Sequence, residues 1–123
     1  MSQAINLNQW IGEGNISNNP VVRYTTGSNR PVTNFNLYID NMYKSKKGSP
    51  NGEFSFKKRT SKIPLVAWAG KAEMISKHYK KGDKVRVVGR LRTRPVTREG
   101  VTYNAFEIVI DNISMIKPSN QQD

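Results

Sequence analysis

Alternation of apolar and polar residues with a period of two is the feature that most restricts the fold of this chain. Between residues 32 and 43, Phe35, Leu37 and Ile39 occupy every second position, and a similar alternation recurs between residues 102 and 116. A strand with this period buries one face and exposes the other. Together with three further extended segments, the pattern predicts five strands: one within 4–16, then 32–43, 63–69, 84–94 and 102–116.

One helix is predicted between the third and fourth strands, over residues 71–81. Ala72, Ile75 and Tyr79 recur at the spacing of one helix face, and Gly82 is expected to end the helix as a left-handed C-cap. The order of three strands, a helix and two strands predicts an all-β fold with one helix, a five-stranded OB-fold barrel. An SH3-like barrel would lack the helix, and a ferredoxin-like fold would need a second one.

Length and composition indicate one domain. We expect residues 1–117 to form it and residues 118–123 to be a short flexible C-terminal tail. The absence of cysteine excludes disulfides and Cys-containing zinc sites. Residues 1–22 contain no Lys or Arg, whereas secretory and transit peptides carry basic residues, and no apolar stretch approaches the ~20 residues of a membrane span. These features predict a cytoplasmic protein that has no membrane partner.

The net charge of +11 is concentrated in two segments. Residues 44–62 contain seven basic residues and one acidic residue, and residues 84–98 contain six basic residues and no acidic one. A basic chain that gathers its charge in this way is typical of a protein with a polyanionic partner. A generally basic, solvated surface is the alternative.

Arginine occupies every second position near the end of the fourth predicted strand. Arg86, Arg90, Arg92 and Arg94 point to one side of it, and residues two positions apart are about 6.6 Å apart along a strand. This spacing is comparable to that of phosphates in an extended single strand, and guanidinium groups bind phosphates with two hydrogen bonds. Because the strand carries no acidic residue, its arginines should repel one another unless a partner neutralises them. A solvated charged face is the alternative.

Aromatic residues lie among or beside these charges, and a flat ring can stack on any base. Trp68 is expected to point outward, because Leu65 and Ala67 have the parity of the core face. The predicted stacking residues are Tyr43, Trp68, Phe54, Phe56 and Tyr38. Filling of the core is the alternative for each of them, and it is favoured for Trp10 and Tyr79.

Residues 44–62 are too many for a tight hairpin and are rich in Gly, Pro, Ser and Lys, which favours a mobile, exposed loop. We interpret this segment as an arm that folds over a bound strand, with a surface insertion as the alternative. Six of its seven basic residues extend the predicted phosphate contacts of the arginines: Lys44, Lys46, Lys57, Lys58, Arg59 and Lys62.

Residues that could support catalysis are sparse. His78 is the single histidine, and with no cysteine beside it a metal site is not expected. The carboxylates form no metal-binding motif, and the chain lacks both a nucleophile elbow and a GxxxxGK[ST] loop. We therefore expect no enzymatic activity, no cofactor, no metal and no small-molecule substrate.

Seven segments, taken in order, resemble the bacterial and phage single-stranded DNA-binding proteins. The similar segments are Gly14 to Ile16, Asn19 to Thr25, Val32 to Leu37, Ala72 to Glu73, Tyr79 to Val85, Val88 to Arg94 and Glu107 to Asp111. The resemblance implies sequence-independent binding and protection of single-stranded DNA during replication, recombination and repair. It implies stacking at Tyr43 and Trp68, whereas two other aromatic positions of the family fall near Lys62 and Val96, which are not aromatic.

The resemblance also implies a homo-oligomer, usually a tetramer, with a dimer as the alternative. Many bacterial members continue into a long linker with an acidic tip. The short segment after Lys117 is more similar to phage or plasmid forms, or to a shortened paralogue. Two other functions remain open. One is an RNA-binding or primosomal OB-fold module, and the other is an adaptor whose basic loops bind an acidic protein.

Overall fold

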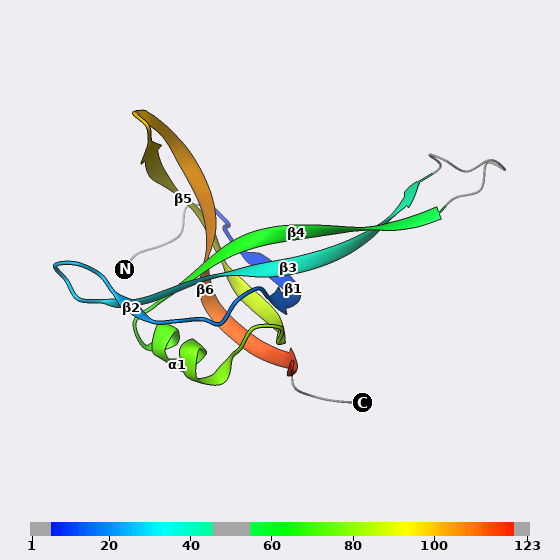
Figure 1. Ribbon diagram of the computed structural model, residues 1–123, viewed down its shortest axis with the longest axis horizontal. Helices are drawn as coiled ribbons and strands as arrows, with labels where there is room; N and C mark the ends of the chain where they lie inside the picture. Colours follow the sequence, from blue (N-terminus) through cyan, green and yellow to red (C-terminus); the bar gives the residue numbers. More distant parts are fainter. Residues whose placement is uncertain (1–5, 46–54, 120–123) are drawn as a thin grey trace.

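The computed structural model describes residues 6–45 and 55–119, which form six strands and one helix (Figure 1). In chain order the elements are β1 (Trp10–Ile16), β2 (Arg23–Tyr24), β3 (Pro31–Ser45), β4 (Ser55–Trp68), α1 (Gly70–His78), β5 (Lys84–Arg98) and β6 (Val101–Lys117). The strands form one sheet in the order β1-β5-β6-β4-β3-β2, and β1 also pairs with β3. This pairing closes β1, β3, β4, β5 and β6 into a barrel and confirms the predicted five-stranded OB-fold. The two-residue β2, which the sequence did not predict, pairs with β3.

Strand β1 closes the barrel because it pairs with two strands. Residues 10–15 run antiparallel to β5, and at the end of the strand Asn15 and Ile16 pair with β3. The backbones approach closely at this crossing, since a Cβ atom on Gly14 would overlap the carbonyl oxygen of Tyr38. A residue without a side chain is therefore required where β1 passes from one strand to the other.

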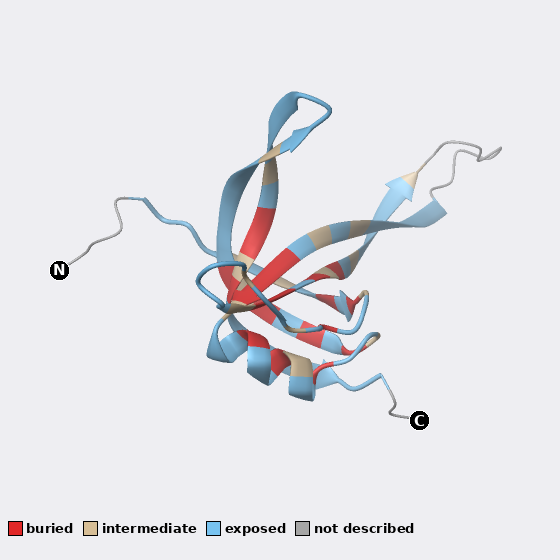
Figure 2. Cartoon of the chain, turned by 60° about the vertical axis from the view of Figure 1, so that its left-hand side comes forward, coloured by how far each residue is buried: buried red, intermediate tan, exposed pale blue. Residues whose placement is uncertain are grey.

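The core lies where the barrel strands and α1 meet (Figure 2). Its side chains come from alternate positions of the strands, as the period-two pattern predicts, and from one face of the helix. They are Ile16, Phe35, Leu37, Leu65, Ala67, Ile75, Tyr79, Val85, Val87, Ile108, Ile110 and Ile113. Trp10 is partly buried and packs against this core, so the structural interpretations of Trp10 and Tyr79 are both confirmed.

The helix is shorter than predicted. It ends at His78, and Tyr79 has extended backbone angles (φ −124°, ψ 143°). Gly82 has a positive φ of 90°, but it lies in the turn beyond the helix, so its predicted role as the C-cap is wrong. The Asp83 carboxylate accepts a hydrogen bond of 2.8 Å from the N–H of Lys80, which stabilises this turn in place of further helix. The described residues contain no helix with the length and apolar character of a membrane span.

Two hairpins extend beyond the barrel, in different directions (Figure 1). Strands β3 and β4 pair continuously as far as Ser45 and Ser55. Strands β5 and β6 pair as far as Arg98 and Val101. We call the outer parts of these hairpins the β3–β4 arm (residues 38–45 and 55–62) and the β5–β6 arm (residues 93–98 and 101–106). Both are mostly exposed (Figure 2).

The β3–β4 arm corrects the prediction of a loop over residues 44–62. Residues 44–45 belong to β3 and residues 55–62 belong to β4, while residues 46–54 lie outside the described part of the chain. The sequence did not reveal these strand residues because a ribbon that is exposed on both faces does not need apolar alternation. Backbone hydrogen bonds and polar cross-strand contacts hold its two strands together, such as the 2.6 Å hydrogen bond from the Thr60 hydroxyl to the Asp40 carboxylate.

Candidate functional site

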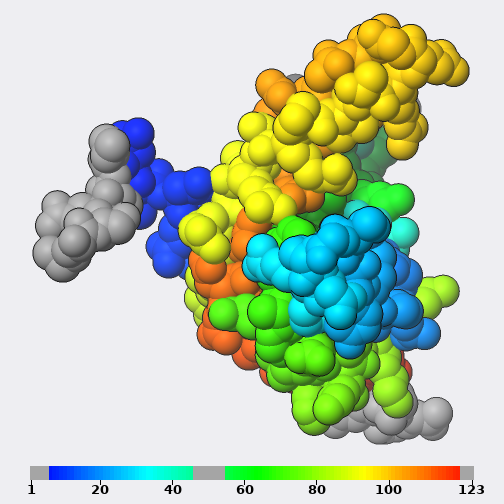
Figure 3. All heavy atoms as spheres, turned by 90° about the vertical axis from the view of Figure 1, so that its left-hand side faces the viewer, coloured from blue at the N-terminus to red at the C-terminus, as the bar shows by residue number. Residues whose placement is uncertain are grey.

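Three hollows on the outside of the barrel share lining residues and form one continuous groove, which we call the outer groove. Its arm end, of about 500 Å³, lies against the β5–β6 arm. Its middle part, of about 200 Å³, contains Trp68 and shares Arg94 and Glu107 with the arm end. Its helix end, of about 430 Å³, shares Trp68 and Arg92 with the middle part and reaches Lys71 of α1. Figure 3 shows two borders of the groove, the yellow to orange β5–β6 arm and the cyan segment that precedes β3.

Strand geometry explains why these side chains face the groove. On β4, Ala67 is buried in the core, so the neighbouring Trp68 points outward. On β5, alternate positions from 90 to 94 carry the arginines that line the groove. Glu107 of β6 lies directly opposite Arg92 in the ladder and faces the same side. The groove is therefore a property of the barrel sheet and is fixed by the register of its strands.

The outer groove is strongly basic. Seven of its described lining residues are basic and two, Glu107 and Asp111, are acidic. The basic residues come from β2, the segment before β3, α1 and β5: Arg23, Arg30, Lys71, Arg90, Arg92, Arg94 and Arg98. A concave surface lined by one sign of charge attracts an extended ligand of the opposite sign.

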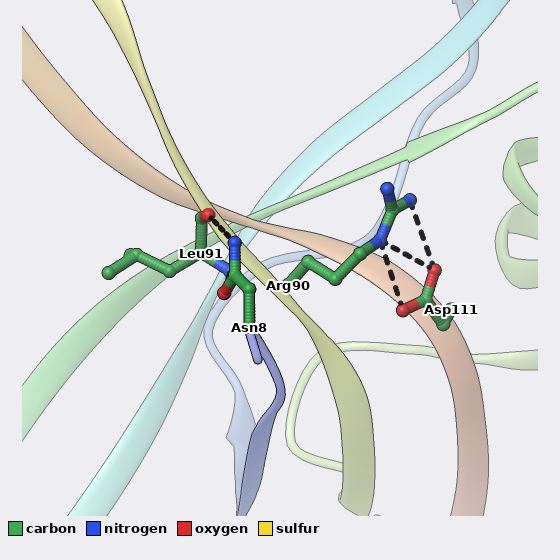
Figure 4. Close-up of polar contacts among 4 residues, drawn as sticks. All are labelled: Asn8, Arg90, Leu91 and Asp111. Atoms are coloured by element: carbon green, nitrogen blue, oxygen red, sulfur yellow. Dashed lines mark hydrogen bonds and ion pairs between the residues drawn. The ribbon is translucent and has the colours of Figure 1, made fainter. Parts of the chain in front are cut away.

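Carboxylates of β6 pair with three arginines of β5. Arg90 binds Asp111, with 3.1 Å between Nη2 and Oδ1 (Figure 4). Glu107 binds both Arg92, at 2.6 Å, and Arg94, at 3.0 Å. The expectation that these arginines repel one another unless a partner neutralises them is therefore wrong for Arg90, Arg92 and Arg94. The acids are absent from β5 itself, but the neighbouring strand supplies them.

The helix end of the groove also includes Asn8, which anchors the segment before β1. Its side-chain amide donates a hydrogen bond of 2.7 Å to the carbonyl oxygen of Leu91 and accepts one of 3.0 Å from the N–H of the same residue (Figure 4). These two bonds continue the β1–β5 ladder by means of a side chain. They hold this segment at the edge of β5, beside Arg90.

Trp68 lies at the junction of the middle part and the helix end of the groove. It is partly exposed, and guanidinium groups lie over its ring at 4.8 Å (Arg30) and 5.8 Å (Arg92) from the ring centroid. Such contacts stabilise a cation at the face of an indole. An aromatic ring and cationic groups are thus combined at one point of the groove, and the indole does not pack inside the barrel.

Residues 7–116 match the model of the Single-strand binding protein family. The chain belongs to this family. It is similar to the single-stranded DNA-binding proteins of Caldanaerobacter subterraneus subsp. tengcongensis (32% identical over 93% of this chain and 71% of that protein) and of Clostridium tetani (27% identical, over 94% and 74%). Its fold is similar to that in the solved structure of the Plasmodium falciparum SSB complex with ssDNA. The TM-score is 0.77 at 20% identity, covering 95% of this chain and 100% of that one.

In this member of the single-strand binding protein family, the residues predicted to bind along the β3–β4 arm divide between two faces. The ladder from Val32↔Trp68 to Ser45↔Ser55 has no shift in register, so parity assigns each side chain to a face. The face shared with Trp68 carries Tyr38, Lys44, Phe56, Lys58 and Lys62. The opposite face carries Tyr43, Lys57 and Arg59, and the Arg59 guanidinium lies 5.1 Å from the centre of the Tyr43 ring.

The predicted site residues are therefore not gathered in one place. Arg90, Arg92, Arg94 and Trp68 line the outer groove, whereas Arg86 is exposed on β5 but does not line it. Tyr38 lines a separate hollow beside β1 and Lys84. Tyr43 and Phe56 are exposed on the β3–β4 arm. Lys46 and Phe54 lie outside the described residues.

Several residues of the groove were not predicted from the sequence. Arg23 and Arg30 precede β3 and reach the groove from β2 and its turn. Tyr103 and Phe106 of β6 line the arm end and are 46% and 61% exposed. The sequence did contain a signal for them. Positions 103 and 106 lie on opposite faces of a strand, so at least one of the two rings cannot point into the core. Within the described chain, no group of three His, Asp or Glu side chains is placed to hold a metal ion.

Proposed function

We propose that this chain binds single-stranded DNA along the outer groove without preference for base sequence. The observation that carries the proposal is the continuity of the groove, which places Trp68 between arginines at both ends in a member of the single-strand binding protein family. Backbone phosphates follow the basic residues, and bases stack on exposed rings, which present the same surface to every base.

Each part of the groove has a role in this proposal. At the arm end, Tyr103 and Phe106 offer rings to bases while Arg94 and Arg98 contact phosphates. In the middle, a base stacks on Trp68 after displacing one of the guanidinium groups beside the ring. At the helix end, Arg30, Lys71 and Arg90 continue the phosphate path.

The same proposal includes the biological role and the assembly. The chain would cover and protect single-stranded DNA during replication, recombination and repair in the cytoplasm of a bacterial or phage-infected cell, and would catalyse no reaction itself. Its relatives are named for binding single-stranded DNA. A tetramer or dimer is supported by the edge of β1, since in the described chain only Asn15 and Ile16 of β1 pair with β3. Residues 1–117 would form the binding domain, and residues 118–123 would lie outside it.

Tryptophan fluorescence during titration with different polymers tests this proposal. We expect poly(dT) to quench the fluorescence and to bind more tightly than poly(rU) or duplex DNA. Tighter binding of poly(rU) would instead favour an RNA-binding or primosomal module. Binding of an acidic polypeptide, with no quenching by any nucleic acid, would favour the adaptor function.

A further inference from the structure

The guanidinium group of Arg30 can leave the Trp68 ring more easily than that of Arg92. It lies over the ring, 4.8 Å from the centroid, and makes no ion pair within the described residues. The Arg92 guanidinium, in contrast, binds Glu107 through two nitrogen atoms, each 2.6 Å from Oε2. Because the Glu107 side chain is only 6% exposed, the loss of this partner is unfavourable. A base that reaches the face of the indole should therefore displace Arg30 and leave Arg92 in place.

The backbone of Arg30 is held close to the indole. Its N–H donates a hydrogen bond of 3.0 Å to the Thr25 hydroxyl, and its carbonyl oxygen accepts one of 3.0 Å from the N–H of Thr25. The next carbonyl oxygen, that of Pro31, accepts a hydrogen bond of 2.9 Å from the N–H of Ala69, which follows Trp68. This segment borders the groove (Figure 3), and Arg30 lines the helix end. A displaced guanidinium group therefore stays within reach of the ring, because only its side chain has to move.

We propose that Arg30 clamps the base that stacks on Trp68, an inference that rests on the proposed function. Once the base has entered, the planar guanidinium group lies on its second face, so that the base is held between Arg30 and the indole. Guanidinium groups stack on aromatic rings, whereas a lysine ammonium group has no plane with which to do so. The N–H groups at the edge of the plane still donate to a phosphate. Stacking thus adds to the place of Arg30 on the phosphate path.

The Arg30→Lys variant keeps the charge and removes the stacking plane. It is tested with a dT oligonucleotide and with an abasic oligonucleotide of the same length and charge. We expect the affinity for the dT oligonucleotide to fall about fivefold more than the affinity for the abasic one. The slope of log K against log salt should stay the same, because the number of cations does not change. Arg30 is exposed, so the variant should keep its fold.

Arg98→Lys is the matched control, because it makes the same exchange at an arginine proposed to contact phosphate alone. It should lower both affinities by a similar factor. Equal factors for the two ligands in Arg30→Lys would reject the clamp. Tighter binding of the dT oligonucleotide by this variant would also reject it, since Arg30 would then only cover the ring. If the unaltered chain does not bind the dT oligonucleotide at all, the proposed function fails together with the inference, which is a different result.

A measurement on the unaltered chain shows the clamp directly. In the free chain, nuclear Overhauser effects should connect the Arg30 side chain with the ring of Trp68, as their 4.8 Å contact implies. With the dT oligonucleotide bound, we expect effects between Arg30 and protons of a thymine base in their place. Effects to deoxyribose protons alone, or an Arg30–Trp68 contact that persists while the oligonucleotide is bound, would overturn the inference.

Discussion

Trp68 combines the two kinds of contact on which the proposed binding depends. Its ring belongs to the groove, and the guanidinium groups of Arg30 and Arg92 lie within 5.8 Å of the ring centroid. A base that stacks on the indole therefore brings its phosphate next to these cations. Because the ring is on the outer face of β4, it can be removed without opening a cavity in the core.

Replacement of Trp68 by Ala should reduce the affinity for poly(dT) by about 1–3 kcal/mol, the usual contribution of one stacked base. The thermal unfolding midpoint should change little. Affinity is measured by fluorescence anisotropy of a labelled dT oligonucleotide, and folding by circular dichroism. A Trp10→Phe variant, altered at the indole that packs against the core, serves as the control and should bind like the unaltered chain. Unchanged affinity in Trp68→Ala would remove Trp68 from the site.

Tyr79 makes folding sensitive to alkaline pH. Burial of the side chain, reinforced by the nearby Asp83 carboxylate, raises the pKa of Tyr79 above 10.0, and its hydroxyl donates a hydrogen bond of 3.3 Å to the carbonyl oxygen of Ile113. The neutral form is therefore favoured in the folded state. Because the unfolded chain releases this proton at lower pH, the stability that Tyr79 contributes is fully present below about pH 10 and is lost as the pH rises further.

Urea unfolding at pH 8 and above pH 10 measures this effect. At pH 8, Tyr79→Phe should be less stable than the unaltered chain by about 1 kcal/mol, since it lacks the hydrogen bond. Above pH 10 this difference should shrink, because only the unaltered chain has the buried hydroxyl to ionise. Tyr24→Phe, at an exposed tyrosine, should leave the alkaline loss unchanged. A difference that stays constant between the two pH values would contradict the assignment.

At the scale of elements, the β3–β4 arm presents two faces that differ in their relation to the groove. Pro64 lines the arm end of the groove, and Lys62 and Lys58 follow it on the same face of β4. Lys57 and Arg59 lie on the opposite face with Tyr43. A single strand of DNA that leaves the groove along β4 therefore meets Lys58 and Lys62 but not Lys57 and Arg59.

Two double variants, each losing two positive charges, distinguish these faces. Lys58→Gln with Lys62→Gln should weaken binding of poly(dT) about tenfold at low salt. It should also make the slope of log K against log salt less negative by about 1.4, as expected for two lost phosphate contacts. Lys57→Gln with Arg59→Gln should change the slope by less than half as much. Equal changes would mean that DNA contacts both faces of the arm.

The barrel could be predicted from the sequence because the alternation that specifies each strand is a local pattern. The alternation around Phe35 and around Ile108 specifies strands whose register also buries the correct face. The length of β4 was missed because β3, a partner distant in sequence, pairs with residues 55–62. The end of α1 was missed because a side-chain contact, from Asp83 to the N–H of Lys80, fixes the turn after the helix, and helical periodicity does not reveal such a contact.

The candidate site was predicted less completely, for a similar reason. The arginines of β5 and the outward direction of Trp68 follow from parity along single strands. The pairing of Glu107 with Arg92 and Arg94 depends on the β5–β6 register, and Arg30 approaches Trp68 from another segment. Contacts between elements of this kind cannot be deduced from the periodicity of either element alone.

At the scale of the whole molecule, much of the basic charge lies along the outer groove and on the β3–β4 arm. The outer groove contributes seven basic residues, and the β3–β4 arm extends the cationic surface beyond the barrel. The barrel orients these side chains by strand register. We therefore expect binding that depends on displaced counterions as well as on stacking.

A titration of the unaltered chain with poly(dT) at several salt concentrations, followed by tryptophan fluorescence, tests both contributions to binding at once. If about five phosphates are neutralised per chain, the plot of log K against log salt should have a slope of about −3.5, with quenching throughout. A slope near zero, or binding without quenching, would show that DNA does not bind by phosphate contacts and stacking along the outer groove.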